Sequence, residues 1–292
     1  MNVPNNKPLA SPAVRRRAQE LGIELQFVPS SGPAGRISHE DLDAYIASGG
    51  RGARTQYAAR DGVEEIKIIG LRRKIAEKMQ ESKRRIPHFA YVEEADMTEL
   101  EDLRAHLNAT KRADQPKLNV LPFMIRALVR VLPSYPQINA RFDDEAGIVH
   151  RYAAVHVGIA TQTANGLIVP VLRHAEARDV WDMTSEISRI AALTREGKAS
   201  RDDLSGSTIT ITSLGALGGV VTTPVINHPE VAIIGPNAIV ERPVVRNGQI
   251  VVRKMMNLSS SFDHRVVDGY DAAEFVQRVK AMLEHPATLF MD

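Results

Sequence analysis

A single break in the hydrophobic pattern, at residues 48–62, constrains this chain more than any other feature. The stretch reads SGGRGARTQYAARDG, which is rich in glycine, arginine and alanine and has no apolar period. Such a composition predicts a flexible linker. We therefore expect a small unit over residues 6–47 and a large domain over residues 63–292.

The small unit contains two short helical patterns, SPAVRRRAQELG and SHEDLDAYIAS. Ser11 followed by Pro12 is typical of a helix start, with an N-cap and a proline at the first helical position. Ser38 with Asp41 three residues later predicts a cap for the second helix. A unit of roughly 40 residues has little core to bury, so it lies near the lower size limit for independent folding.

The large domain alternates helical and strand-like patterns, which predicts one α/β or α+β domain. Its most apolar helical segment, VLPFMIRALVRVL, is expected to be buried, and Asn165-Gly166 predicts a hairpin turn. The other expected helices are LRRKIAEKM, TELEDLRAHLN, DVWDMTSEISRIAALTREG and YDAAEFVQRVKAMLE. The expected strands are IPHFAYVEEAD, AAVHVGIATQT, LIVPVLRHA, STITITSLG, VAIIGPNAIV and QIVVRKMMNLSSSF.

Composition excludes several classes of function. The chain has no cysteine, which removes disulfides, thiolate zinc sites and a cysteine nucleophile. The formal net charge of +2 does not suggest nucleic-acid binding. No apolar run is long enough for a membrane span, and MNVPNNKPLA is not a signal pattern. We expect a cytoplasmic protein, or a processed mitochondrial one.

The sharpest chemical pattern is SFDHRVVDG, between a strand and the last helix, in which His264 precedes Asp268 by four positions. Histidine titrates near neutrality, so an exposed ring at such a turn can take and return a proton. Alone, the H-x-x-x-D spacing is weak, and a hydrogen-bonded structural histidine is the alternative. No metal site is predicted, because the neighbourhood offers no complete ligand set.

The whole string resembles the D-H-R-x-x-[DN]-G signature of the dihydrolipoamide acyltransferases, which share their fold with chloramphenicol acetyltransferase. Four further segments resemble the same family in the same order, and with the signature they are distributed over essentially all of residues 63–292. The segment IPHFAYVEEAD resembles the branched-chain members in particular. The segments are IPHFAYVEEAD, NGLIVPVLRHA, GSTITITSLGALGG and PVINHPEVAIIG. The resemblance implies an α/β two-layer sandwich of the chloramphenicol-acetyltransferase type.

The resemblance also implies catalytic roles. His264 matches the general base that deprotonates the coenzyme A thiol, and Thr212 matches the Ser/Thr that stabilises the tetrahedral oxyanion, with Ser213 as the alternative. Asp268 matches an Asp/Asn position, whose expected role is to hold the histidine loop through Arg72 or Arg73. A positioned hydroxyl of this kind contributes about 3 kcal/mol to transition-state stability in other enzymes. No covalent acyl-enzyme is required.

Binding roles follow with competing structural interpretations. Arg72, Arg73 and Lys74 are candidates for binding the coenzyme A phosphates, with a solvated helix face as the slightly favoured alternative. His88 either lines the acyl pocket or packs in its strand. His228 is expected near the active-site channel.

The small unit resembles the peripheral subunit-binding domain of the same enzymes. Residues 32–37, GPAGRI, match its G-x-G-G-R-[IV] loop, with Ala34 in place of a glycine, where a positive φ would be strained. The resemblance implies docking of the decarboxylase or the dihydrolipoamide dehydrogenase by charge complementarity. The alternative of an arginine-rich nucleic-acid-binding unit is disfavoured by the downstream domain. The expected docking side chains are Arg15, Arg16, Arg17 and Arg36.

The lipoyl domain of the family, with its lysine-bearing hairpin, does not appear in this sequence. We expect a truncated chain, with dihydrolipoamide as a substrate presented from elsewhere. The predicted function is acyl transfer between dihydrolipoamide and coenzyme A, with branched-chain acyl groups favoured over acetyl. The resemblance implies trimers that share active sites, with His264 from one chain and Thr212 from the next, and that assemble into a 24-mer or 60-mer. The alternatives are a free-standing small-molecule acetyltransferase and a non-catalytic scaffold.

Overall fold

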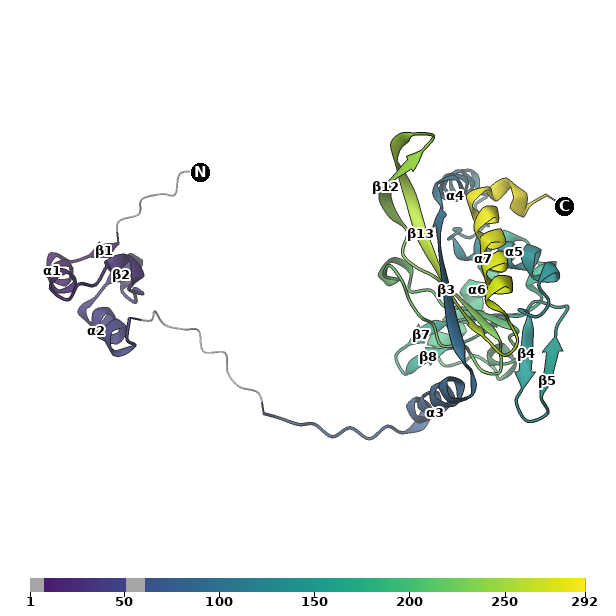
Figure 1. Cartoon of the computed structure of the whole chain (residues 1–292), viewed down its shortest axis with the longest axis horizontal. Helices are drawn as coiled ribbons and strands as arrows, with labels where there is room; N and C mark the ends of the chain where they lie inside the picture. Colours follow the sequence, from purple (N-terminus) through teal and green to yellow (C-terminus); the bar gives the residue numbers. More distant parts are fainter. Residues whose placement is uncertain (1–7, 51–60, 292) are drawn as a thin grey trace. The chain divides into compact units, whose positions relative to one another are not determined.

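The computed structural model describes residues 8–50 and 61–291, and the chain divides into two units, Met1–Ile66 and Lys67–Asp292 (Figure 1). Residues 51–60, most of the predicted linker, lie outside the described residues. Each unit has a hydrophobic core of its own. Among the described residues, no helix has both the length and the apolar character needed to cross a membrane.

The small unit consists of two helices beside a short parallel strand pair. α1 (Pro12–Glu20) begins at Ser11, whose Oγ accepts the Val14 N–H, and α2 (His39–Ala47) begins at a Ser38–Asp41 capping box. Both predicted helix starts are therefore confirmed. The buried apolar side chains of its core are Val14, Ala18, Val28, Ile37 and Leu42. The remaining elements are β1 (Leu9–Ala10), β2 (Arg36–Ile37) and 3-10 turns at Leu25–Phe27 and Pro33–Gly35.

The loop before α2 contains an alanine in a left-handed conformation. Ala34 has φ 53°, and Gly35 follows at φ 72°. This conformation costs a residue with a Cβ about 1–2 kcal/mol, so the strain expected at Ala34 is present. Gly32 is required for a different reason, because a Cβ there would lie 2.4 Å from the Arg36 carbonyl oxygen.

A mixed seven-stranded sheet forms one layer of the large unit. Its strand order is β12-β13-β11-β10-β6-β9, and β3 pairs with β13. The long strand β13 runs antiparallel to β3, β11 and β12, whereas β10 runs parallel to β6 and β11. The strands are β3 (His88–Asp96), β6 (Val157–Ile159), β9 (Val171–Leu172), β10 (Ile209–Ile211), β11 (Ala232–Pro236), β12 (Val240–Arg246) and β13 (Gln249–Asp263).

Helices form the second layer, which Figure 1 shows beside the sheet. The apolar helix α5 is buried as expected, and it contacts both α6 and α7. Phe262 of β13 meets Phe275 of α7 edge-on, with ring centroids 6.3 Å apart. The predicted α/β two-layer sandwich is therefore confirmed. The helices of this layer are α4 (Thr98–Thr110), α5 (Leu121–Val131), α6 (Val180–Arg195) and α7 (Gly269–Glu284).

Two hairpins and one further helix lie outside the main sheet. β7 (Thr161–Thr163) and β8 (Gly166–Ile168) form the hairpin that Asn165-Gly166 predicts, and the helix α3 (Gly70–Arg85) contacts β8. β4 (Ala140–Asp143) and β5 (Ile148–Arg151) form a second hairpin, which the sequence patterns did not indicate. Further 3-10 turns lie at Leu132–Ser134, Ala175–Ala177, Asp202–Leu204, Gly215–Leu217 and Pro286–Leu289.

Candidate active site

His264 lies in the turn that joins β13 to α7, and its side chain is exposed. Its backbone N–H donates to the Pro87 carbonyl (3.2 Å), and one side of its ring rests on Phe89, with ring centroids 4.4 Å apart. Neither ring nitrogen is bonded to any residue that the structure describes. The turn therefore holds the backbone firmly while leaving the imidazole open to a substrate, as a general base requires.

Asp263 and Arg265, the residues on either side of His264, form an ion pair with each other. Asp263 is fully buried, and it accepts hydrogen bonds from Arg265 Nε (2.9 Å) and from a terminal guanidinium nitrogen (2.6 Å). The Asp263 N–H donates to the Val231 carbonyl (2.9 Å). The hydrogen bond to Asp263 raises the pKa of Arg265 above its ordinary value, so this buried carboxylate faces a permanent cation.

Asp268 caps the helix α7 through its backbone, and its carboxylate is exposed. The predicted bridge from Asp268 to Arg72 or Arg73 is not formed, because no described residue bonds to this carboxylate. Arg73 instead pairs with Glu77 one helical turn away (2.9 Å). Exposure of both His264 and Asp268 leaves this end of the site without a cover.

Thr212 follows directly after β10, at the start of the glycine-containing loop. Its backbone N–H donates to the Ile234 carbonyl (2.9 Å), and its half-buried side chain lines a cavity of about 120 Å³ together with Thr222 and Asn237. Ser213, the alternative oxyanion donor, accepts the Gly215 N–H through its Oγ (3.2 Å), which ties this side chain to its own loop. No described residue forms a hydrogen bond with the Thr212 hydroxyl.

The strand registers place His264 and Thr212 beyond opposite ends of the short central strand β10. Ile211 pairs with Ile234 of β11, which pairs with Ser260 of β13, so Thr212 is level with Ser259. His264 lies five positions after Ser259, directly beyond the end of β13. At about 3.4 Å per residue, this is a separation of about 17 Å along the strands. One chain therefore cannot bring both side chains to the same carbonyl group.

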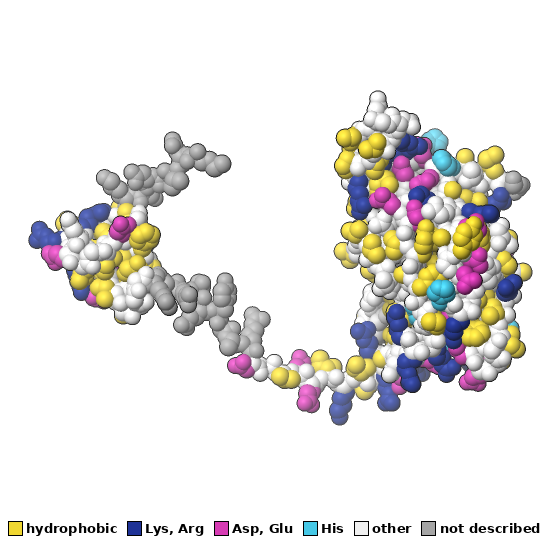
Figure 2. Space-filling model, viewed as in Figure 1, with side chains coloured by type: hydrophobic (Ala, Val, Ile, Leu, Met, Phe, Trp, Pro, Cys, Tyr) yellow, Lys and Arg dark blue, Asp and Glu magenta, His cyan; other side chains and the backbone are white. Residues whose placement is uncertain are grey.

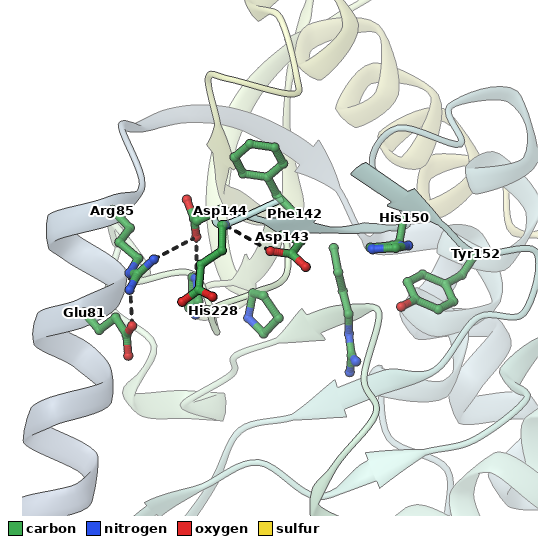
Figure 3. Close-up of a pocket in the computed structure, with 11 residues that line it drawn as sticks. Glu81, Arg85, Phe142, Asp143, Asp144, His150, Tyr152 and His228 are labelled. Atoms are coloured by element: carbon green, nitrogen blue, oxygen red, sulfur yellow. Dashed lines mark hydrogen bonds and ion pairs between the residues drawn. The ribbon is translucent and has the colours of Figure 1, made fainter. Parts of the chain in front are cut away.

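A larger cavity, of about 330 Å³, lies between α3 and the β4–β5 hairpin (Figure 3). His228 lines this cavity, and its Nε2 is 2.8 Å from Asp144 Oδ2. Neither His264 nor Thr212 lines the cavity. His228, which the sequence predicts to lie near the active-site channel, therefore pairs with Asp144. Asp144 also accepts a hydrogen bond from Arg265, the residue that follows His264.

His88 is held through both of its ring nitrogens. Nδ1 lies 2.9 Å from the Ile86 carbonyl, to which it donates, and Nε2 accepts the Ile226 N–H (3.0 Å). Burial lowers the pKa of His88, which favours the neutral ring that this arrangement needs. These contacts support the structural interpretation of His88 over the pocket-lining one.

A buried carboxylate that the sequence patterns did not reveal lies behind the Thr212 strand. Glu230 is only 1% exposed and accepts hydrogen bonds from Ser207 (2.5 Å), Thr210 (2.6 Å) and Asn227 (2.6 Å). Burial raises the pKa of Glu230 above its ordinary value. Because Thr210 precedes Thr212 by two positions, this cluster anchors the strand that presents the hydroxyl.

The expected cationic side chains differ in how free they are. Arg72 and Lys74 lie exposed in the first turns of α3. In the small unit, Arg17 pairs with Asp43 (2.6 Å) and Arg15 donates to the Pro8 carbonyl (2.5 Å). Arg16 and Arg36 are exposed and form no ion pair with described residues. Figure 2 shows the Lys and Arg side chains on the surface of each unit.

Within residues 8–50 and 61–291, no group of three or more His, Cys, Asp or Glu side chains is arranged to hold a metal ion. The exposed imidazole of His264 can transfer a proton, and the Thr212 hydroxyl can donate a hydrogen bond. A thiol and a thioester are suitable reactants for such a pair, because the thiolate is the nucleophile and the carbonyl develops negative charge.

Family models match both units. The model described as "2-oxoacid dehydrogenases acyltransferase (catalytic domain)" matches residues 60–291, and the "e3 binding domain" matches residues 8–43. A "Lipoamide acyltransferase component of branched-chain alpha-keto acid dehydrogenase complex" from Pseudomonas aeruginosa is 65% identical over 99% of this chain and 69% of its own length. The Pseudomonas putida protein of the same name is 62% identical, with the same two coverages.

Solved structures agree with the fold. A dihydrolipoamide acetyltransferase from Azotobacter vinelandii is 32% identical, with a TM-score of 0.75 over 82% of this chain and 100% of its own. The "cubic core of the pyruvate dehydrogenase multienzyme complex" is 33% identical, with a TM-score of 0.76 over 82% of this chain and 98% of its own.

Proposed function

Because the chain belongs to the family of 2-oxoacid dehydrogenase acyltransferases, we propose that it transfers acyl groups between dihydrolipoamide and coenzyme A. It is the acyltransferase component of a multienzyme complex, and it supplies the core of that complex. The observation that carries this function is the open imidazole of His264, held on a clamped turn with both ring nitrogens unbonded among the described residues.

His264 acts as the general base. It removes the proton of the coenzyme A thiol as the sulfur attacks the carbonyl carbon of acyl-dihydrolipoamide. The Thr212 hydroxyl donates a hydrogen bond to the oxyanion of the tetrahedral intermediate. The bond from carbon to the dihydrolipoamide sulfur then breaks, and that sulfur takes the proton back from the imidazolium. Acyl-coenzyme A and dihydrolipoamide result, with no covalent enzyme intermediate.

Two copies of the chain build each active site. The separation of about 17 Å along the sheet between His264 and Thr212 supports this arrangement. We propose a trimer in which each chain gives His264 to one site and Thr212 to the next, and in which trimers assemble into a 24-mer. The similar pyruvate dehydrogenase core is described as cubic.

A similar enzyme supports these residue assignments. The Azotobacter vinelandii acetyltransferase has been studied for the roles of a serine, a histidine and an asparagine in its catalytic mechanism. The asparagine follows the histidine there by four positions, as Asp268 follows His264 here. Asp268 holds the start of α7 through its backbone, and its exposed carboxylate has no partner among the described residues.

Branched-chain acyl groups are the proposed substrates. The two Pseudomonas relatives named for the branched-chain complex are 62–65% identical, whereas a Staphylococcus aureus relative named for the pyruvate dehydrogenase complex is 37% identical. Discrimination between acyl groups amounts to about 1–3 kcal/mol of binding free energy per methylene, so steady-state kinetics is needed to establish the preference.

Arg72, Arg73 and Lys74 bind the phosphates of coenzyme A at the channel mouth.

The small unit docks a peripheral enzyme of the complex. We assign residues 6–47 to a peripheral subunit-binding domain, 48–62 to a linker and 63–292 to the catalytic domain. Arg16 and Arg36 are the freest of the four expected arginines, so they are the main contacts for an acidic surface on dihydrolipoamide dehydrogenase or the decarboxylase. Arg17 contributes less because Asp43 already neutralises it.

Steady-state acyl transfer to dihydrolipoamide tests the function, with isobutyryl-CoA, isovaleryl-CoA and acetyl-CoA compared as donors. We expect higher kcat/KM for the two branched donors. A preference for acetyl-CoA would keep the mechanism but reject the branched-chain assignment. No transfer by the assembled protein would reject the enzymatic function.

A further inference from the structure

The guanidinium group of Arg265 is held on two edges by carboxylates from different parts of the chain. Nε and one terminal nitrogen donate to Asp263, and the other terminal nitrogen donates to Asp144. The group also lies over the ring of Phe142, 4.5 Å from its centroid. Arg265 directly follows His264 in the chain, so whatever fixes this guanidinium group restrains the histidine turn.

Asp144 comes from the turn of the β4–β5 hairpin, far from the histidine turn in sequence. Its side chain is 12% exposed, and its second oxygen pairs with His228 Nε2 (2.8 Å). Burial alone would raise the pKa of Asp144, but hydrogen bonds from His228 and Arg265 outweigh it and hold this pKa below its ordinary value. Asp144 is therefore ionised at neutral pH. Its carboxylate contacts His228, Arg265 and Arg85, which come from three separate segments of the chain. Figure 3 shows the contacts with His228 and Arg85.

The neighbouring Asp143 provides an internal comparison. Its Oδ1 accepts the N–H groups of Glu145 and Ala146 (3.0 Å each), so it stabilises only its own turn. Both aspartates line the same cavity, and only Asp144 reaches Arg265. A role in positioning the histidine turn therefore belongs to the second carboxylate of this pair.

We propose that Asp144 is a positioning residue for His264, acting through Arg265 and Asp263. The proposal rests on the proposed function, because it assumes that His264 is the base. Asp144 fixes Arg265, Arg265 grips the buried Asp263, and the turn between them aims the imidazole at the thiol. A base displaced by a fraction of an ångström loses rate while substrates still bind, because binding depends on other groups.

The test is steady-state acyl transfer by the assembled core with Asp144→Asn, Asp144→Glu and Asp143→Asn. We expect Asp144→Asn to lower kcat about tenfold with both KM values within about twofold of wild type, since the effect is on geometry at the reacting atoms. Asp144→Glu restores part of kcat by returning the charge. Asp143→Asn keeps wild-type kcat. Wild-type kcat for Asp144→Asn would overturn the proposal.

A second route covers the case in which Asp144→Asn does not assemble. Arg265→Lys keeps the cation but cannot bridge two carboxylates, so it is expected to lower kcat by a similar factor. Combined with Asp144→Glu, it should lose no more than Arg265→Lys alone, because residues that act through one contact are not additive. Independent losses that multiply would overturn the proposal. His264→Ala is measured in parallel, and its full activity would reject the proposed function instead.

Discussion

The two ends of the central strand β10 differ in how the residues beyond them, His264 and Thr212, are held. At one end, His264 lies in a turn whose backbone N–H groups donate to the carbonyls of Pro87 and Val231, and which the Asp263–Arg265 ion pair stabilises. At the other end, Thr212 is followed by a loop whose apolar side chains face solvent. The most exposed of these are Leu214 at 59%, Leu217 at 86%, Val220 at 61% and Val221 at 53%.

This difference indicates that a single chain fixes the turn that carries His264 but leaves the loop beside Thr212 exposed to solvent. Four large apolar side chains on one loop form an exposed patch of the kind that marks an association surface. In the proposed trimer, a second copy covers this loop and supplies the His264 that acts with Thr212.

Loss of the base should have the largest effect. For His264→Ala we expect kcat to fall by about 10³-fold with the assembly intact, because positioned general bases contribute about 10²–10⁴-fold. The exposed His106 of α4 serves as the matched control, and His106→Ala should keep wild-type kcat. Equal activity in the two variants would remove His264 from the mechanism.

Loss of the hydroxyl should come next. Thr212→Val removes the donor at nearly constant volume, and we expect about a 10²-fold fall in kcat, as for other oxyanion donors. Thr212→Ser keeps the hydroxyl and should stay within several-fold of wild type. A fall of the same size in both variants would point to packing, and not to hydrogen bonding, at this position.

A charge on the exposed loop should weaken association. Burial of one leucine contributes about 1.5–3 kcal/mol, so Leu217→Asp should shift the protein from the large assembly towards smaller species in sedimentation. Leu9→Asp, at a 54% exposed leucine of the small unit, is the control and should leave the assembly unchanged. An intact assembly for Leu217→Asp would show that the loop is not covered by another copy.

Acid should loosen the His264 end slightly. The folded-state pKa of His88 is lowered, so its contribution to stability is present above the unfolded value of about 6.5 and is lost as pH falls through the folded value. Thermal unfolding should therefore move to lower temperature between pH 7 and pH 5, and less so in His88→Asn. Identical pH dependence in the two proteins would contradict the role of the ring.

The sequence revealed residues whose role is local or carried by a short motif. The helix caps at Ser11 and Ser38, the hairpin at Asn165 and the turn of His264 all depend on neighbours in the chain. Asp144 and Glu230 could not be recognised in this way, because their partners lie far away in sequence and no periodic pattern marks them. The pairing of Arg17 with Asp43 was missed for the same reason.

The shared active site is tested most directly by mixing two inactive chains. His264→Ala and Thr212→Val chains are co-expressed in equal amounts, and acyl transfer by the mixed assembly is compared with each parent. Random trimers should place an intact His264 opposite an intact Thr212 in about a quarter of the sites, so activity should recover to about a quarter of wild type. Activity no higher than the mean of the two parents would show that each chain builds its own site.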